Sequence, residues 1–174
     1  MTNPALRANL KDIQDLHSDI SHGTLPAVSI VKPDGYLDGQ PASSKWDLLK
    51  GFTKKIIKMV RAKPALWQDT AIMITDDEGG GYYDSGYVQP VDFFGDGTRV
   101  PLIVVSPYST GGRVVHTCYD HVSFDKFVEA NWNVPPISPT GRDNLPNPLP
   151  TPGNPWVPSN QPAIGDLMDM FQFP

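Results

Sequence analysis

Prolines crowd the last quarter of this chain and limit what it can fold into. Of its 174 residues, the 42 from Asn133 onward hold 11 of the 19 prolines. Proline fixes φ and has no backbone N–H, so such a stretch forms neither a regular helix nor a sheet. Residues 133–163 are therefore predicted to be an irregular segment that wraps the surface or is partly disordered. Beyond it, a short docking helix is predicted from Ile164, Leu167, Met168 and Phe171.

Three amphipathic helices are predicted before that segment from apolar residues at three- and four-residue steps. The first carries Leu6, Leu10, Ile13, Leu16 and Ile20, and Gly23 is its predicted stop. The second begins at a capping box of Ser44 and Asp47 and ends at Pro64. Its apolar stripe is Trp46, Leu49, Phe52, Ile56 and Val60. The third begins near Asp120, a good N-cap, and carries Phe124, Phe127, Val128 and Trp132.

Short apolar runs between these helices predict strands. Pro26–Pro33 is expected to be a buried strand, and Thr70–Thr75 a second one. The third, Val100–Ser106, is almost continuously apolar, as in a strand covered on both faces. A fourth is expected over Gly112–His116. The alternation of helices and strands predicts an α/β fold, and the length predicts a single domain of residues 1–174.

Composition and charge limit the possible partners. The formal charge is −5, and the densest basic patch recurs at helical spacing, as on a solvated helix face. It consists of Lys54, Lys55, Lys58, Arg61 and Lys63. Nucleic acid is therefore not expected as a partner, because it usually needs a basic surface. The chain has no run of 18 apolar residues for a membrane helix, and Cys118 is its only cysteine, so an internal disulfide is impossible.

A run of acids and glycines is the strongest candidate for a functional site. The second predicted strand leads directly into Asp76, Asp77 and Glu78, and three glycines follow. Adjacent carboxylates repel one another, and a hard cation is the usual partner that offsets this repulsion. Glycines let the backbone turn sharply and approach a ligand. We therefore expect half of a metal-dependent site here, the alternative being a solvated acidic turn. Asp84, after the glycines, is expected to cap a turn, the alternative being a further metal ligand.

Two histidines form the second candidate. His116 and His121 bracket a short turn after the third strand, and His121 follows Asp120 at a predicted helix start. A histidine there could bind metal, orient a ligand or move protons, and a helix start favours anions. Alternatively, Asp120 only caps the helix and His121 is a surface residue of its first turn. Arg99 and Arg142 could pair with phosphate or with acids of this chain.

Four motifs occur in a fixed order along the chain. They are T-x-D-E-x-G-G-x-Y-D, R-V-P-L-I-V-V-S-P-Y, H-x-x-x-D-H-x-S-x-x-K-F-x-E-x-N-W and R-D-N. In this order they resemble the C-terminal part of the bacterial phosphoesterase family, which contains phosphatidylcholine-type phospholipases C and acid phosphatases. The resemblance covers roughly residues 10–173. It implies part of an alkaline-phosphatase-like sheet with flanking helices, followed by the proline-rich C-terminal segment.

The resemblance also implies a chemistry. Members of this family are metal-assisted phosphoester hydrolases that use a hydroxyl nucleophile and a phosphoryl-enzyme intermediate. On the matching positions, Asp77 and Glu78 would bind a divalent metal ion of unknown identity. His121 would line the site, with His116 as a weaker catalytic candidate. The substrate would be a phospholipid or a phosphomonoester.

Three departures from the family pattern lead to further expectations. Members are more than twice this length, and their early metal-binding pair and nucleophile fall before Met1. Histidines common in the family are absent at Gly39–Pro41 and at Ser85. We therefore expect an incomplete enzyme that is at best weakly active alone, and that needs its missing N-terminal half or self-associates. The alternative is a non-catalytic module of the same fold. Members are often periplasmic or secreted, but this N-terminus lacks the apolar core of a signal peptide, so localisation stays open.

Overall fold

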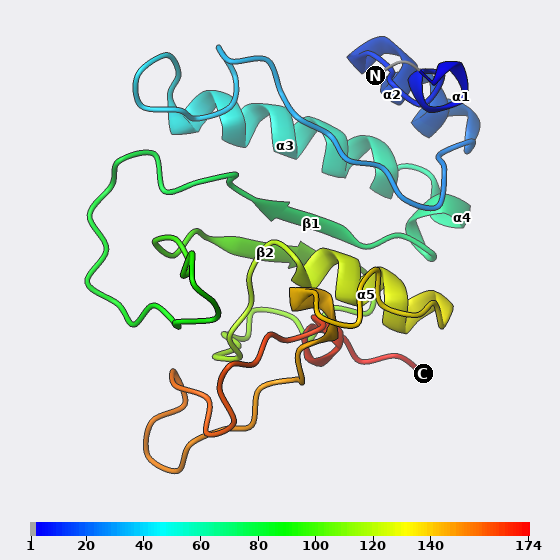
Figure 1. The fold of residues 1–174 in the computed structure, drawn as a ribbon. Coiled ribbons are helices and arrows are strands. Elements are labelled where there is room, and N and C mark those ends of the chain that lie inside the picture. The colour runs from blue at the N-terminus through cyan, green and yellow to red at the C-terminus, as the bar shows by residue number, and fades with distance from the viewer. Residues whose placement is uncertain (1–2) are drawn as a thin grey trace. The chain divides into compact units, whose positions relative to one another are not determined.

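The computed structural model describes residues 3–174, which form a mixed α/β structure of helices and one small sheet (Figure 1). The chain divides into two compact units, one ending at Ile72 and the other comprising Met73–Pro174. Each unit is described by itself below. No helix in residues 3–174 has the length and apolar character needed to cross a membrane.

The first unit begins with two short helices where the apolar stripe predicted one. They are α1 (Pro4–Arg7) and α2 (Ile13–His22). Asp12 separates them, because its side chain accepts hydrogen bonds from the backbone N–H groups of Gln14 and Asp15 and so starts a new helix. The predicted stop is confirmed, since Gly23 ends α2 in the left-handed conformation at φ 70°.

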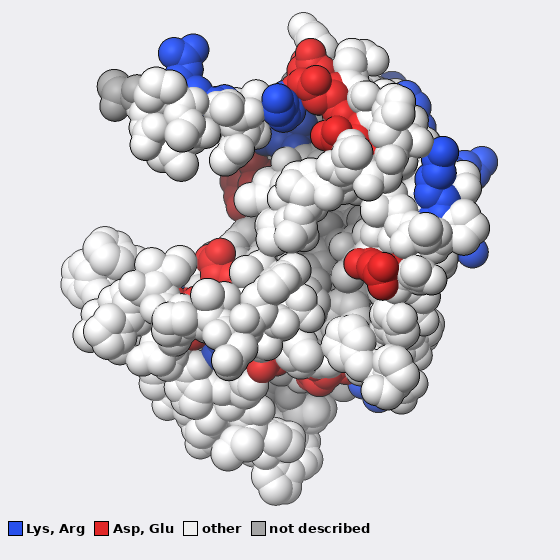
Figure 2. Space-filling model, turned by 90° about the vertical axis from the view of Figure 1, so that its right-hand side faces the viewer, with Lys and Arg blue, Asp and Glu red and all other residues white. Residues whose placement is uncertain are grey.

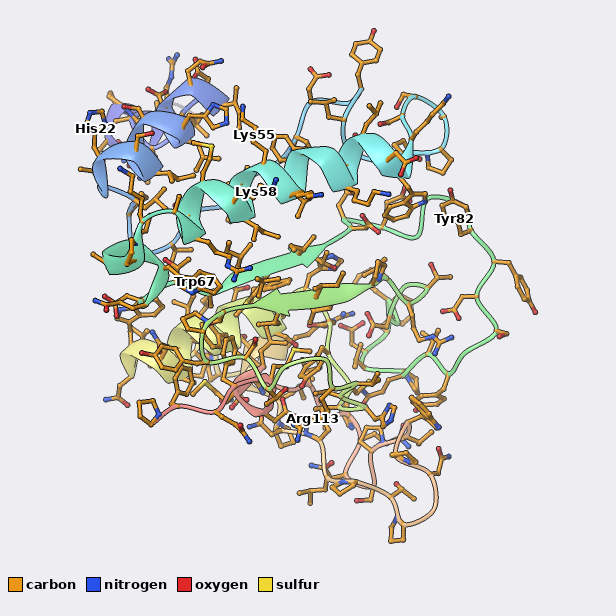
Figure 3. The ribbon with its side chains drawn as sticks, turned by 180° about the vertical axis from the view of Figure 1, so that it is seen from behind. His22, Lys55, Lys58, Trp67, Tyr82 and Arg113 are labelled. Carbon is orange, nitrogen blue, oxygen red and sulfur yellow. The ribbon has the colours of Figure 1, made fainter. Side chains whose placement is uncertain are left out.

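The second predicted helix is confirmed as α3 (Trp46–Arg61), with Val60 buried. The predicted capping box is wrong. Lys45 is the N-cap without a side-chain cap, and the Ser44 hydroxyl donates instead to the Tyr36 carbonyl at 2.8 Å. Lys55 and Lys58 lie on the exposed side of α3 (Figure 3). Another short helix, α4 (Pro64–Trp67), follows α3 and begins with proline, which is suited to a first helical turn.

The predicted buried strand Pro26–Pro33 does not form. This segment is irregular, and Ile30 in its middle is 96% exposed. A strand needs a hydrogen-bonded neighbour, and within residues 3–174 the sheet pairs only two other segments. An apolar run alone does not supply that neighbour.

The sheet consists of β1 (Ile72–Thr75) and β2 (Leu102–Val105), so the predictions at Thr70–Thr75 and Val100–Ser106 are confirmed with shorter bounds. The two strands run in opposite directions (Figure 1), and the Thr75 hydroxyl at the end of β1 donates to the Pro101 carbonyl just before β2 at 2.9 Å. The prediction that both faces of the third strand are covered is wrong, because Ile103 is 55% exposed.

The fourth predicted strand, Gly112–His116, is also wrong, because that segment forms no strand. Side chains tether this part of the chain instead of a backbone ladder. Arg113 donates to the Asp169 carbonyl at 3.1 Å, and the neighbouring Thr117 hydroxyl donates to the Asp169 carboxylate at 2.5 Å.

The second unit continues with α5 (Ser123–Trp132), the third predicted helix. Its proline-rich continuation is irregular apart from the 3₁₀ turn η1 (Arg142–Asn144), as predicted. The predicted docking helix is only a three-residue 3₁₀ turn, η2 (Met168–Met170), although Ile164, Leu167 and Phe171 are buried as a docking segment requires. The core of this unit lies around it and consists of Val91, Ala163, Ile164, Leu167 and Phe171.

Two contacts attach the C-terminal segment to the rest of the second unit. The Phe171 ring lies 5.2 Å from that of Phe127 on α5, measured between centroids. The buried Gln89 amide exchanges two hydrogen bonds of 2.8 Å with the backbone of Ala163. The proline-rich segment thus closes the core of this unit, although it lacks regular secondary structure.

Candidate functional site

The site begins where β1 ends. The β-branched residues of this strand give way to Asp76, Asp77 and Glu78, and Gly80 and Gly81 follow with φ of 60° and 80°. These angles belong to the left-handed region, which favours glycine. The glycines therefore let the chain leave the strand at once and keep the acids at its end.

The three acids differ in their exposure. Asp76 is half-buried, whereas Asp77 and Glu78 are exposed. Burial, and then the neighbouring charge of Asp77, raise the pKa of Asp76 above its usual value. Negative charge is thus crowded at this strand end, and a cation near Asp77 and Glu78 would relieve it.

His121 lies at the same strand end. Its Nε2 is 3.0 Å from the Asp76 carbonyl oxygen, although the two residues are 45 positions apart. A carbonyl oxygen only accepts hydrogen bonds, so Nε2 carries the proton in this contact and Nδ1 is the acceptor of the neutral ring. His121 precedes α5 and is exposed. It is therefore more than a surface residue of the first helical turn, because it connects the start of α5 to the end of β1.

An arginine holds the surroundings of His121 together. Arg142 in η1 binds the Asp120 carboxylate at 3.4 Å, that of Asp92 at 2.7 Å and that of Asp96 at 3.7 Å. The hydrogen bond from Arg142 lowers the pKa of Asp92, whereas burial and the charge of Asp120 raise that of Asp96. Three acids surround one guanidinium, so this corner of the site is negative overall.

Sequence reasoning missed this cluster. It considered Arg142 as a partner for phosphate or for acids, and the structure gives it acids. The prediction that Asp120 is the N-cap of α5 is wrong: Val122 is the N-cap, and the Asp120 side chain, two residues earlier, accepts from the Val122 N–H at 2.8 Å. The acids of the segment V-D-F-F-G-D-G were the only available signal.

Asp84 is a turn residue, as predicted. Its carboxylate accepts from the Gly86 N–H at 2.8 Å and pairs with Arg99 at 2.6 Å. The Arg99 guanidinium, and then the backbone donors, hold the pKa of Asp84 well below its usual range. A β-carbon at Gly86 would lie 1.9 Å from that guanidinium, so a larger residue here would displace the Arg99 side chain from its contact with Asp84. Both candidate arginines are therefore partners of acids.

His116 is in a different environment. Its ring packs edge-on against that of Trp156 in the proline-rich segment, with centroids 4.0 Å apart. Together with Cys118 and several prolines it lines a cavity of about 170 Å³. Burial raises the pKa of Cys118, which fits a packed thiol rather than a nucleophile.

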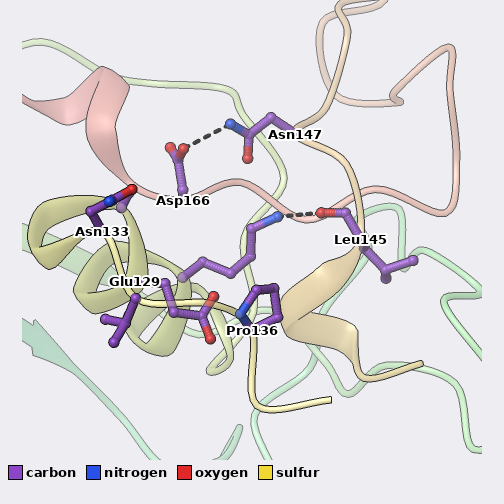
Figure 4. A pocket seen from close by; sticks show the side chains of 9 residues that line it. Glu129, Asn133, Pro136, Leu145, Asn147 and Asp166 are labelled. Atoms are coloured by element: carbon purple, nitrogen blue, oxygen red, sulfur yellow. Dashed lines mark hydrogen bonds between the residues drawn. The ribbon is translucent and has the colours of Figure 1, made fainter. Parts of the chain in front are cut away.

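A larger cavity of about 360 Å³ lies between α5 and the C-terminal segment (Figure 4). Lys126 is buried there and donates to the Leu145 carbonyl, and burial lowers its pKa. Asn147 donates to Asp166 at 2.7 Å across the same cavity. None of the four predicted site residues lines it. The Lys126 contact joins α5 to the stretch after η1, whereas the buried Glu129 Oε1 in the same cavity has no hydrogen-bond partner among the described residues.

The donor chemistry at the end of β1 suits a hard divalent cation, which prefers carboxylate oxygens. In the part of the chain from residue 3 onward, however, no three His, Cys, Asp or Glu side chains are grouped closely enough to hold a metal ion. Asp77 and Glu78 therefore fit part of a ligand set rather than a complete one.

Charges of both signs occur on the surface. On the face drawn in Figure 2, Asp and Glu side chains are visible as well as Lys and Arg, and uncharged side chains cover most of it. The basic side chains of α3 and its C-terminal flank, predicted to form a solvated face, are exposed. They are Lys54, Lys55, Lys58, Arg61 and Lys63.

Comparison with known proteins identifies the family. The model of the phosphoesterase family matches residues 3–135, which include Asp77, Glu78 and both candidate histidines. The chain belongs to the phosphoesterase family. This membership confirms the resemblance inferred from the four motifs.

Several relatives of this chain are phospholipases C by name. Non-hemolytic phospholipase C of Burkholderia pseudomallei is 30% identical over 76% of this chain and 22% of its own length. Phospholipase C B of Mycobacterium tuberculosis is 30% identical over 70% of this chain and 28% of its own length. Hemolytic phospholipase C of Pseudomonas aeruginosa is 26% identical over 94% of this chain and 23% of its own length. The chain thus spans about a quarter of the length of these relatives.

Proposed function

We propose that this phosphoesterase-family chain acts in metal-dependent hydrolysis of phosphoric esters, as a phospholipase C or acid phosphatase of the alkaline-phosphatase-like type. One observation carries the proposal. The family match includes Asp77, Glu78 and His121, and the His121 ring is hydrogen-bonded to the backbone of the same strand end that bears the two carboxylates. Family membership and local geometry therefore point to the same place.

The candidate site residues would have separate roles in hydrolysis. Asp77 and Glu78 would hold a divalent cation, which when bound polarises a phosphoryl oxygen and offsets charge developing in the transition state. His121, whose Nε2 donates to the Asp76 carbonyl, would present Nδ1 as an acceptor to the hydroxyl group of a nucleophile or an attacking water. His116 is the weaker catalytic candidate, because the structure packs it against Trp156.

The substrate class follows from the relatives. Those named above are phospholipases C, and we propose that the present chain likewise acts on a phosphoester, either a phospholipid or a phosphomonoester. Asp77 and Glu78 are exposed, so a substrate could approach them from solvent.

Hydrolysis of two chromogenic esters would test this function. The full chain is stripped with EDTA, restored with Mg²⁺, Mn²⁺, Ca²⁺ or Zn²⁺, and assayed on p-nitrophenyl phosphorylcholine and p-nitrophenyl phosphate. We expect turnover that one of the metals restores and that Asp77→Ala and Glu78→Ala abolish. Asp69→Ala, which removes another exposed carboxylate, is the matched control and should retain it. The proposal would be rejected if turnover in EDTA, or turnover by Asp77→Ala and Glu78→Ala, equalled that of the unaltered chain with metal restored.

A second candidate function is a module of the same fold that binds a cation or a partner without turnover. The absence of a three-ligand group among residues 3–174 favours it, because so few donors hold a cation loosely. Metal binding seen by calorimetry, without hydrolysis of either ester under any of the four metals, would select this candidate over the first.

A further inference from the structure

The turn Asp92–Gly95 presents two phenyl rings to solvent. Phe93 is 95% exposed and Phe94 is 88% exposed, and their rings form an edge-to-face pair with centroids 5.3 Å apart. Large apolar side chains grouped on a surface usually mark a place of interaction. This pair therefore calls for an explanation beyond folding.

The turn is braced on both sides. Within it, the Asp92 carboxylate accepts from the Phe94 N–H at 2.8 Å, and the Gly95 N–H donates to the Asp92 carbonyl at 3.1 Å. From outside, Arg142 donates to the Asp92 carboxylate at 2.7 Å and to the Gly95 carbonyl at 2.6 Å. The rings are thus displayed by an ordered turn, and little ordering entropy remains to be lost when they bind something.

The same arginine connects this turn to the candidate site. Arg142 also binds the Asp120 carboxylate, and the next residue, His121, reaches the end of β1. Further exposed aromatic side chains lie on the connection between β1 and β2 that carries the turn. Tyr82, labelled in Figure 3, is 54% exposed, and Tyr83 is 93% exposed. Tyrosine favours surfaces where an apolar layer meets a wet one.

We propose that Phe93 and Phe94 insert into a phospholipid surface with zwitterionic headgroups and so bring the end of β1 to its lipid substrate. This proposal rests on the proposed function, which supplies the lipid. The choice of headgroup comes from charge. Residues 76–101 carry six acids and one basic residue, so an anionic surface would repel them, whereas a zwitterionic one would not.

Vesicle sedimentation in EDTA tests the proposal independently of hydrolysis. The full chain is mixed with phosphatidylcholine vesicles, and bound protein is measured against lipid concentration. We expect Phe93→Ala/Phe94→Ala to weaken binding by roughly a hundredfold, because each of the two phenyl rings moved out of water contributes on the order of tenfold to affinity. Replacing one-fifth of the lipid with phosphatidylglycerol should also weaken binding of the unaltered chain.

Val114→Ala/Ile137→Ala is the matched control. It removes two apolar side chains that are 74% and 82% exposed in the same unit, and binding should be unchanged. All four side chains are largely exposed, so both double variants should fold, and circular dichroism checks this. The proposal would be overturned if the Val114→Ala/Ile137→Ala control bound vesicles as weakly as Phe93→Ala/Phe94→Ala. It would also be overturned if the unaltered chain bound no vesicles. Sedimentation equilibrium showing that the phenyl pair holds two copies of the chain together instead would overturn it as well.

The proposed hydrolase function can be rejected while the proposal of lipid binding stands. Asp77→Ala removes a proposed metal ligand and should leave vesicle affinity in EDTA unchanged. Binding that survives while both ester assays fail would uphold the lipid surface and reject the hydrolase. Loss of vesicle binding in Asp77→Ala would show that the acids rather than the phenyl rings make the contact, and would overturn the inference.

Discussion

At the scale of single residues, the carboxylates around the β1–β2 connection differ in their exposure. Asp84 accepts hydrogen bonds from Arg99 and Gly86, and its side chain is 10% exposed. Asp77 is exposed at the strand end. We therefore predict that Asp77→Ala lowers the affinity for a divalent metal by about tenfold or more, and that Asp84→Ala lowers it less. Isothermal titration calorimetry of both variants decides this, and equal losses would reject Asp77 as a ligand.

The Asp84–Arg99 pair should make the stability of the fold depend on pH. Arg99 lowers the pKa of Asp84 in the folded state, so the unfolded chain takes up this proton at a higher pH. The pair stabilises the fold above the usual carboxyl pKa of about 3.8, and this contribution is lost as the pH falls below it. Between about pH 5 and about pH 3, the Tm of the unaltered chain should fall more than that of Arg99→Gln. An equal fall in Tm for the unaltered chain and Arg99→Gln over this pH range would contradict this prediction.

The sequence alone allows candidate site residues to be proposed, but it does not predict which of them are in contact. The order strand, acids, glycines is local, so Asp77 and Glu78 could be proposed directly from the sequence. The contact of His121 with the Asp76 carbonyl joins positions 45 apart, and no local pattern encodes it. The same holds for Arg142, which gathers acids from two distant segments. Spacing shows which side chains are available, but tertiary packing decides which of them meet.

At the scale of elements, two glycines allow a matched test of helix formation. Gly23 ends α2 at φ 70°, and a β-carbon there would meet nothing within 4 Å, so only the backbone opposes a side chain. Gly51 lies inside α3, also with open space around it. We predict that Gly23→Ala destabilises the fold by about 1 kcal/mol, and that Gly51→Ala stabilises it by roughly 0.5–1 kcal/mol. Urea unfolding measures both, and changes of the same sign would contradict the assignment.

The attachment of the proline-rich segment should depend on Gln89. Its side chain is buried and exchanges two hydrogen bonds with Ala163. Gln89→Ala would leave that backbone without partners, so we predict a loss of about 1–3 kcal/mol in unfolding free energy. Gln172→Ala, which removes an exposed amide near the C-terminus, should lower the unfolding free energy much less. A negligible loss for Gln89→Ala would show that the segment is held by its apolar contacts alone.

Helices and strands could be predicted where the signals that form them lie within one segment of the chain. The stripe of α3 and the stop of α2 at Gly23 follow from side-chain period and backbone freedom. Pro26–Pro33 failed because a strand exists only with a partner, and the apolar run did not reveal that none lies beside it among residues 3–174. Gly112–His116 failed for a related reason, since side chains bound to Asp169 hold that part of the chain in place of a ladder.

At the scale of the whole molecule, the family match and the candidate site differ in extent. The match covers residues 3–135 and so enters both compact units, whereas the acids, His121 and Arg142 all belong to the second unit. The relatives named above are about four times as long as the stretch they share with this chain. The end of β1, where Asp77, Glu78 and His121 lie, is therefore the part of the molecule at which the proposed function can be tested.

Paramagnetic NMR tests the proposed metal site at the end of β1 most directly. Mn²⁺ broadens the signals of nuclei close to it, and the 19.1 kDa chain is small enough for signals to be followed residue by residue. We predict that low Mn²⁺ broadens residues 76–81 and the His121 ring first, and that Asp77→Ala/Glu78→Ala removes this effect. Broadening that begins instead around Asp166 in the C-terminal segment, or that persists in the double variant, would contradict a metal site at the end of β1.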